Sequence, residues 1–139
     1  MTLTLHATPE EVMRAVETLQ EIGRQRGVGE RDLFGLALAL EECGSNIVNH
    51  AFRRDARQQF QVTFEHTKDA FVIELRDRGP AFDPTAASDR GAQANDDDRA
   101  GGWGLQLVRR YMDEIRYTRE AGQNVLRLTK RPMPATGGK

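Results

Sequence analysis

The hydrophobic pattern of this chain changes its period part-way along the sequence, and that change restricts the fold more than any other feature. Between residues 9 and 52, apolar residues recur at the three- and four-residue spacing of amphipathic helices. From residue 60 onward, apolar and polar residues alternate in short runs, as they do in half-buried strands. A chain that places two helices before several strands is expected to pack one layer against the other.

The helical part divides into two segments. The first starts at Thr8-Pro9, where Thr8 fits an N-cap, Pro9 fits the first helical position and Glu11 completes a capping box. The second is predicted over about residues 30–52, and its apolar stripe is formed by Leu33, Leu36, Ala37, Leu40, Ile47, Val48 and Ala51.

The alternating runs predict a short first strand and two antiparallel hairpins, with strands near residues 2–5, 60–64, 71–75, 115–119 and 124–130. A third helix is expected from about residue 105 to 113. We therefore predict an α+β fold, a two-layer α/β sandwich in which helices cover one face of a mixed, mainly antiparallel sheet. Residues 1–131 are expected to form a single domain, and residues 132–139 a flexible C-terminal tail.

Composition argues against several classes of function. The 20 basic and 21 acidic residues give a net charge of −1, without the basic excess typical of nucleic-acid binding. The longest apolar run, Leu33–Leu40, is too short to cross a membrane, and the N-terminus does not resemble a signal peptide. The single Cys43 is typical of a reducing compartment. We expect a cytoplasmic protein without a membrane or nucleic-acid partner.

Three short segments carry candidate functional residues. On the second helix, Glu42, Asn46 and Asn49 fall on one narrow face opposite the apolar stripe. Asn46 offers an amide oxygen of the kind that Mg²⁺ accepts, and Glu42, one turn away, offers a carboxylate that can take a proton. The same pattern is also what any amphipathic helix shows on its solvent face.

The other two segments are an acid-glycine turn and a glycine cluster. The predicted strand that begins at Phe71 ends at Asp77. The Asp77 carboxylate could accept a hydrogen bond from the amino group of adenine beside Gly79. Gly101, Gly102 and Gly104 precede a helix, whose free N–H groups attract anions. Taken singly, each segment could equally be an ordinary turn. Residues 83–100 between them have no usable periodicity and are predicted to form a loop.

In this order the three segments resemble the N, G1 and G2 boxes of the GHKL (Bergerat-fold) ATP-binding superfamily, in particular its small anti-sigma-factor serine/threonine kinases. The resemblance covers residues 3–131 and rests on Glu42…Asn46…His50-Ala51-Phe52, on Asp77-Arg78-Gly79-Pro80-Ala81-Phe82-Asp83-Pro84, and on Gly101-Gly102-Trp103-Gly104-Leu105. In two places the chain departs from the family pattern: Ala81 stands where a second glycine is common, and Trp103 lies within the glycine box.

The resemblance implies a role for each box. It makes Glu42 the general base, Asn46 the ligand of Mg²⁺ and Asp77 the residue that reads adenine. It makes residues 83–100 the lid over bound ATP. It assigns the following positions to the nucleotide site as well: Asn49, Gly79, Ala81, Phe82, Gly101, Gly102, Trp103, Gly104, Leu105 and Thr129.

The resemblance further implies a kinase that uses ATP and Mg²⁺ to phosphorylate a serine on a STAS-domain anti-sigma-factor antagonist. A homodimer and a sigma factor as a second partner belong to the same expectation. Two alternatives remain open at this point. One is a catalytically inactive module that regulates a partner by ATP occupancy, and the other is the ATPase domain of a histidine kinase.

Overall fold

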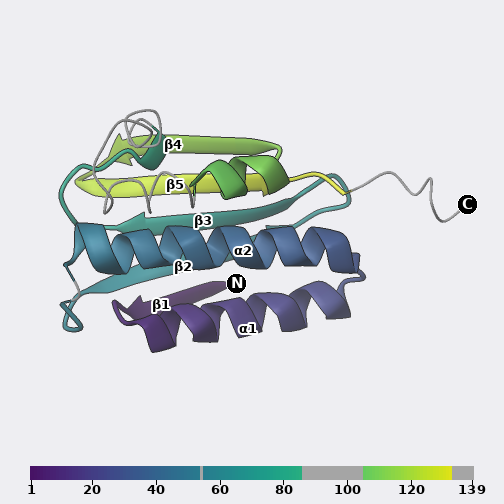
Figure 1. The fold of residues 1–139 in the computed structure, drawn as a ribbon, viewed down its shortest axis with the longest axis horizontal. Coiled ribbons are helices and arrows are strands. Elements are labelled where there is room, and N and C mark those ends of the chain that lie inside the picture. The colour runs from purple at the N-terminus through teal and green to yellow at the C-terminus, as the bar shows by residue number, and fades with distance from the viewer. Residues whose placement is uncertain (54, 86–104, 133–139) are drawn as a thin grey trace, which may run out of the picture.

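The computed structural model describes residues 1–53, 55–85 and 105–132, and these form two layers (Figure 1). The elements of the helical layer are α1 (Pro9–Gln25), α2 (Glu30–Asn46), the short π-helix η1 (Ile47–Ala51) and a helical segment at residues 105–111. The strands are β1 (Thr2–His6), β2 (Gln59–His66), β3 (Phe71–Asp77), β4 (Glu114–Glu120) and β5 (Gln123–Lys130).

The strands form one five-stranded sheet in the order β1-β2-β3-β5-β4. Every pairing among the described strands is antiparallel, so this sheet is not mixed. Figure 1 shows the helices on one face of the sheet. The predicted α+β two-layer fold is confirmed.

The start of α1 follows the sequence signal closely. The Thr8 hydroxyl accepts a hydrogen bond from the Glu11 N–H at 3.1 Å, and Pro9 occupies the first turn. The Glu11 carboxylate does not reach back to Thr8 itself. It accepts instead from the His6 N–H at 3.2 Å and binds Arg14 at 2.7 Å. These bonds lower the pKa of Glu11 to about 2, with Arg14 the larger cause.

The second helix changes geometry near its end. We predicted one helix over residues 30–52, but regular α-helix ends at Asn46 and the next five residues form η1. Single π-turns inside helices are rare and frequently accompany functional sites. Here the widened turn lies directly after Asn46 and next to the end of β3, where the Gly79 backbone comes close to Ala51.

The core lies between the layers and forms one cluster. Side chains that are fully buried come from every element of the helical layer and from four strands. Among them are Leu5, Leu19, Leu36, Leu40, Val48, Val62, Ile73, Leu75, Val108 and Leu128. Gly44 lets α1 and α2 approach closely, since a Cβ there would lie 3.1 Å from a methyl group of Val12. This packing fixes α2 over the centre of the sheet, and with it the polar residues at its C-terminal end.

Two strands that are distant in sequence bring the site together. β5 inserts between β3 and β4, and in this register Asp77, the last residue of β3, lies opposite Asn124 on β5. Part of the predicted site lies outside the described residues, namely lid residues 86–100 and the cluster Gly101–Gly104. The predicted tail also lies outside them, except for residue 132. In the part of the chain that the structure describes, no helix is both long and apolar enough to cross a bilayer.

Candidate functional site

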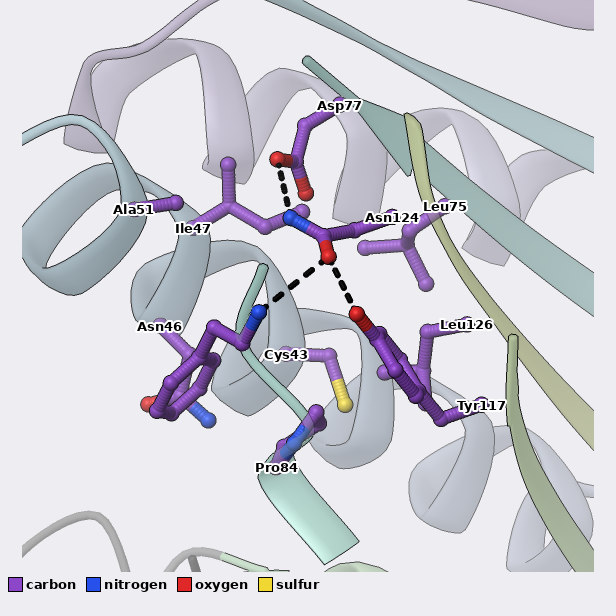
Figure 2. Close-up of a pocket in the computed structure, with 11 residues that line it drawn as sticks. Cys43, Asn46, Ile47, Ala51, Leu75, Asp77, Pro84, Tyr117, Asn124 and Leu126 are labelled. Atoms are coloured by element: carbon purple, nitrogen blue, oxygen red, sulfur yellow. Dashed lines mark hydrogen bonds between the residues drawn. The ribbon is translucent and has the colours of Figure 1, made fainter. Parts of the chain in front are cut away.

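A small cavity lies where the end of α2 meets the ends of β3 and β5 (Figure 2). Its volume is about 30 Å³, room for one or two water molecules. It is lined by Cys43, Asn46, Ile47, Ala51, Leu75, Asp77, Phe82, Pro84, Tyr117, Asn124 and Leu126. The structure therefore gathers Asn46, Asp77 and Phe82 from two separate sequence boxes around one space.

Asp77 is held by one of its two carboxylate oxygens. Its side chain is buried, with 5% of the residue exposed. Oδ1 accepts hydrogen bonds from the Gly79 N–H and from the Asn124 side-chain amide, both at 2.9 Å. No described residue bonds Oδ2, and no atom of this side chain is both buried and unsatisfied. The carboxylate is thus fixed in orientation, with one oxygen left to accept a bond from a ligand.

Asn124 connects most of the polar groups in the site, and sequence reasoning missed it. Its Nδ2 donates to Asp77 and to the Pro80 carbonyl, each at 2.9 Å. Its Oδ1 accepts from the Phe82 N–H at 3.2 Å and from the Tyr117 hydroxyl (Figure 2). A signal was present in the sequence: Asn124 takes an inward position of a strand whose next inward residues are Leu126 and Leu128. A polar side chain at such an inward-facing position must find hydrogen-bond partners inside the fold.

Strand β4 contributes two more residues that the sequence analysis did not select. The Tyr117 ring lines the cavity and its hydroxyl donates to Asn124. The Arg119 guanidinium donates to the Gly79 carbonyl at 2.8 Å and to Asn124 Oδ1 at 3.1 Å. The turn after β3 is therefore held by a charge-assisted bond from β4, which lies beyond β5 in the sheet.

Gly79 is a position where close approach requires glycine. A Cβ added there would lie 3.0 Å from Ala51 Cβ and 3.0 Å from Asp77 Oδ1. The first of these atoms belongs to η1 and the second to the carboxylate that Gly79 itself binds. Gly79 thus allows the turn after β3 to lie against the end of the helix.

Glu42 and Asn46 lie one turn apart on α2, and both side chains remain available to bind a ligand. Neither makes a hydrogen bond or ion pair with any described residue, although both are half-buried. Burial, and then the charge of neighbouring Glu41, raises the pKa of Glu42. Asn46 lines the cavity, whereas Glu42 and the exposed Asn49 do not. A half-buried carboxylate without a partner is a candidate base.

The segment after Gly79 lies over the cavity. The half-buried Phe82 ring lines the cavity and stacks on His50, with ring centroids 6.1 Å apart. Pro84 borders the same space, whereas Ala81 is exposed and does not line it. Phe82 and Pro84 therefore form the part of the cavity wall that follows the Gly79 turn.

Two further predicted residues do not line the cavity. Leu105 is buried in the core between the layers. Thr129 pairs with Val72, five positions along β5 from Asn124, and lies toward the other end of the sheet. The structure therefore does not bring Thr129 to the cavity, and the residue of β5 that it does bring there is Asn124.

The donor set at Asn46 is compatible with Mg²⁺. In the described part of the chain, no three histidine, cysteine, aspartate or glutamate residues gather as metal ligands. Mg²⁺ usually takes one or two protein oxygens and completes its shell with phosphate oxygens and water. The uncommitted amide oxygen of Asn46, beside a free carboxylate, fits that pattern.

Known proteins are similar to this chain over most of its length. Residues 5–130 match the model of the histidine kinase-like ATPase domain. The chain is 34% identical over 134 residues to Serine/threonine-protein kinase BtrW of Bordetella bronchiseptica, covering 96% of this chain and 94% of that protein. It is 26% identical over 125 residues to Serine-protein kinase RsbW of Oceanobacillus iheyensis, covering 86% of this chain and 79% of that protein.

A solved structure has the same fold. It contains the RsbU and RsbW domains of Rv1364c from Mycobacterium tuberculosis, and it matches with a TM-score of 0.69 at 21% identity. The match covers 95% of this chain but only 32% of that longer one. At this identity the likeness concerns the fold alone.

Proposed function

We propose that this chain, which belongs to the histidine kinase-like ATPase domain family and is a serine/threonine-protein kinase, phosphorylates a serine on a STAS-domain antagonist of an anti-sigma factor. Residues 1–131 would be the catalytic domain. The observation that carries the proposal is Asn46 on the wall of a cavity that Asp77 also lines, with Glu42 one turn before it on α2. Neither Glu42 nor Asn46 bonds any described residue.

Adenine recognition is proposed for Asp77. ATP use is common to this family, and the free Oδ2 of Asp77 can accept a bond from the exocyclic amino group of adenine. Asn124 supports this role because it occupies Oδ1 and so fixes which oxygen remains available. Guanine carries a carbonyl where adenine carries that amino group, and two acceptors facing each other repel.

Phosphoryl transfer is proposed to use Glu42 as the base. The serine oxygen forms a bond to the γ-phosphorus, the bond to the ADP oxygen breaks, and Glu42 takes the serine proton. Burial supports this role, since a raised pKa makes the carboxylate a stronger base. The Asn46 amide oxygen would hold Mg²⁺, which would neutralise phosphate charge when bound. Gly101, Gly102, Trp103 and Gly104 remain predicted phosphate-binding residues.

The proposed assembly is a homodimer, with a sigma factor as a second partner. β1 supports the dimer because it is an edge strand of the sheet, and no other described strand pairs with its outer side, where a second copy could pair. Light scattering should then give twice the mass of the chain. A monomer at every concentration would remove the dimer from the proposal and leave the kinase intact.

The test of the function is transfer of labelled phosphate from ATP to STAS-domain proteins encoded beside this chain. Glu42→Gln keeps the shape of the side chain and removes the base, so transfer should fall by about 10²–10⁴-fold while ATP affinity is nearly retained. Asn46→Ala should weaken Mg²⁺-dependent ATP binding and transfer together. Glu17→Gln, at an exposed position on α1, is the matched control and should change neither.

The outcomes separate the alternatives. Transfer by Glu42→Gln at the wild-type rate would show that Glu42 is not the base. ATP binding without transfer to any of the co-encoded STAS proteins would favour a module that acts by occupancy. Autophosphorylation on histidine would favour the histidine kinase alternative.

A further inference from the structure

An apolar strip lies on the helical layer outside the nucleotide cavity. Phe34 on α2 is 59% exposed and Leu107 is 39% exposed. Leu38, one turn after Phe34, and Tyr111, one turn after Leu107, are half-buried. Single exposed apolar residues are common on protein surfaces, but a contiguous group usually marks a site of interaction. We call these four residues the Phe34 strip.

The strip is held rigidly between two helices. The rings of Phe34 and Tyr111 meet edge to face, with centroids 5.6 Å apart and planes at 73°. Gly35 makes this possible, because a Cβ there would lie 2.8 Å from Tyr111 Cβ. Figure 1 shows the helix at residues 105–111, in green, beside α2 on the same face of the sheet. A preformed aromatic pair loses little conformational freedom when a partner binds it.

Two arginines border the strip, and neither has a partner in the described structure. Arg31 lies one turn before Phe34 on α2, and Arg110 one turn after Leu107. Both are exposed, and neither forms an ion pair or hydrogen bond with any described residue. Uncommitted guanidinium groups beside an apolar surface favour a partner with carboxylates at the matching edge.

The Phe34 strip lies on the same side of α2 as Glu42, the proposed base. Phe34, Leu38 and Glu42 follow one another at four-residue intervals on one side of the helix. At 1.5 Å per residue, Glu42 lies only about 12 Å beyond Phe34. A bound protein that buries an interface of usual area over the strip therefore also reaches Glu42.

We propose that the Phe34 strip is the docking surface for the protein substrate, and that the substrate meets it with an apolar patch bordered by acidic residues. This inference rests on the kinase function proposed above.

The test measures rates of phosphate transfer to a co-encoded STAS-domain protein as its concentration is varied. Phe34→Ala and Leu107→Ala should each raise the KM for that protein about tenfold or more, as loss of a central interface residue does. The kcat and the affinity for ATP should not change. Met13→Ala is the matched control, since Met13 is 41% exposed on α1, away from the strip.

A second pair of variants tests the charged border. Arg31→Glu and Arg110→Glu should each raise the same KM, and added salt, which raises the wild-type KM, should no longer do so in the double variant. These two arginine variants keep every apolar side chain of the strip. It therefore reports on docking even if an alanine variant folds poorly, and ATP binding by calorimetry verifies the fold of every variant.

Failure of the docking proposal and failure of the function have different signatures. A wild-type KM in all four variants, with transfer intact, would overturn the docking proposal and leave the kinase function standing. A wild-type protein that binds ATP and transfers nothing would overturn both. Loss of a dimer in Phe34→Ala at unchanged KM would assign the strip to a contact between copies, which also contradicts the proposal.

Discussion

Glu42 is a residue whose proposed role and effect on stability oppose each other. Its pKa is raised in the folded protein by burial and by Glu41. A carboxylate whose folded pKa lies above its unfolded pKa stabilises the fold only at low pH, and that contribution is lost as pH rises through the folded pKa. We expect Glu42→Gln to be more stable than wild type at pH 7, with the difference vanishing below pH 4.

Urea unfolding at the two pH values measures this difference. Glu41→Gln should shift the acid limb of the kcat profile to lower pH, because it removes a neighbouring charge that raises the pKa of Glu42. Two results would contradict the description of Glu42 as a partly desolvated carboxylate without a partner. One is an acid limb that does not move in Glu41→Gln, and the other is a Glu42→Gln variant less stable than wild type at pH 7.

Asn124 bonds several polar groups of the site at once. Removing its amide would leave the Phe82 N–H and the Tyr117 hydroxyl without their Asn124 acceptor, the Pro80 carbonyl without its donor, and Asp77 Oδ1 with only one of its two hydrogen bonds. Since one such group costs about 1–3 kcal/mol, Asn124→Ala should lower the free energy of unfolding by roughly 2 kcal/mol or more. The same variant should weaken ATP binding. Gln123→Ala, one residue away on the other face of β5, should change stability by less than about 0.5 kcal/mol.

At the scale of elements, the start of α1 offers a direct measurement. Thr8→Ala removes the acceptor for the Glu11 N–H and leaves the first turn without its cap. The expected loss of unfolding free energy is about 1 kcal/mol. Thr18→Ala is the control, because its hydroxyl only bonds the Arg14 carbonyl within the same helix and so should be nearly neutral. Equal losses in the two variants would show that capping does not stabilise this helix.

The helices and strands themselves were largely predictable from sequence. The change of helix type after Asn46 and the pairing between distant strands were not. The strands and α1 followed from the two- and three-to-four-residue periods, since those periods arise from burial of one face. Nothing local indicated that the helical hydrogen bonds would widen after Asn46. The pairing of Asp77 with Asn124 depends on register between strands that are distant in sequence. For that reason the sequence alone could not place Asn124 beside Asp77.

At the scale of the whole molecule, a bound nucleotide should stabilise the fold by mass action. ATP with Mg²⁺ at 100 times its Kd adds about 2.7 kcal/mol, which for a domain of this size raises Tm by roughly 10 °C. GTP at the same concentration should give a much smaller shift, and Asp77→Asn should lose most of the ATP effect. Differential scanning fluorimetry measures all three. Equal shifts with ATP and GTP would contradict adenine recognition by Asp77.

The strand order also has a consequence for synthesis on the ribosome. β3 is a central strand, yet its partner on one side is β5, and the Asp77–Asn124 contact joins residues 47 positions apart. At 5–20 residues per second, roughly 2–9 s pass between translation of the two residues. During that interval β3 presents an unpaired hydrogen-bonding edge beside its apolar residues, a surface that favours aggregation. A nascent chain halted before β5 should therefore depend on chaperones and have no adenine pocket, whereas the complete chain should depend on them far less.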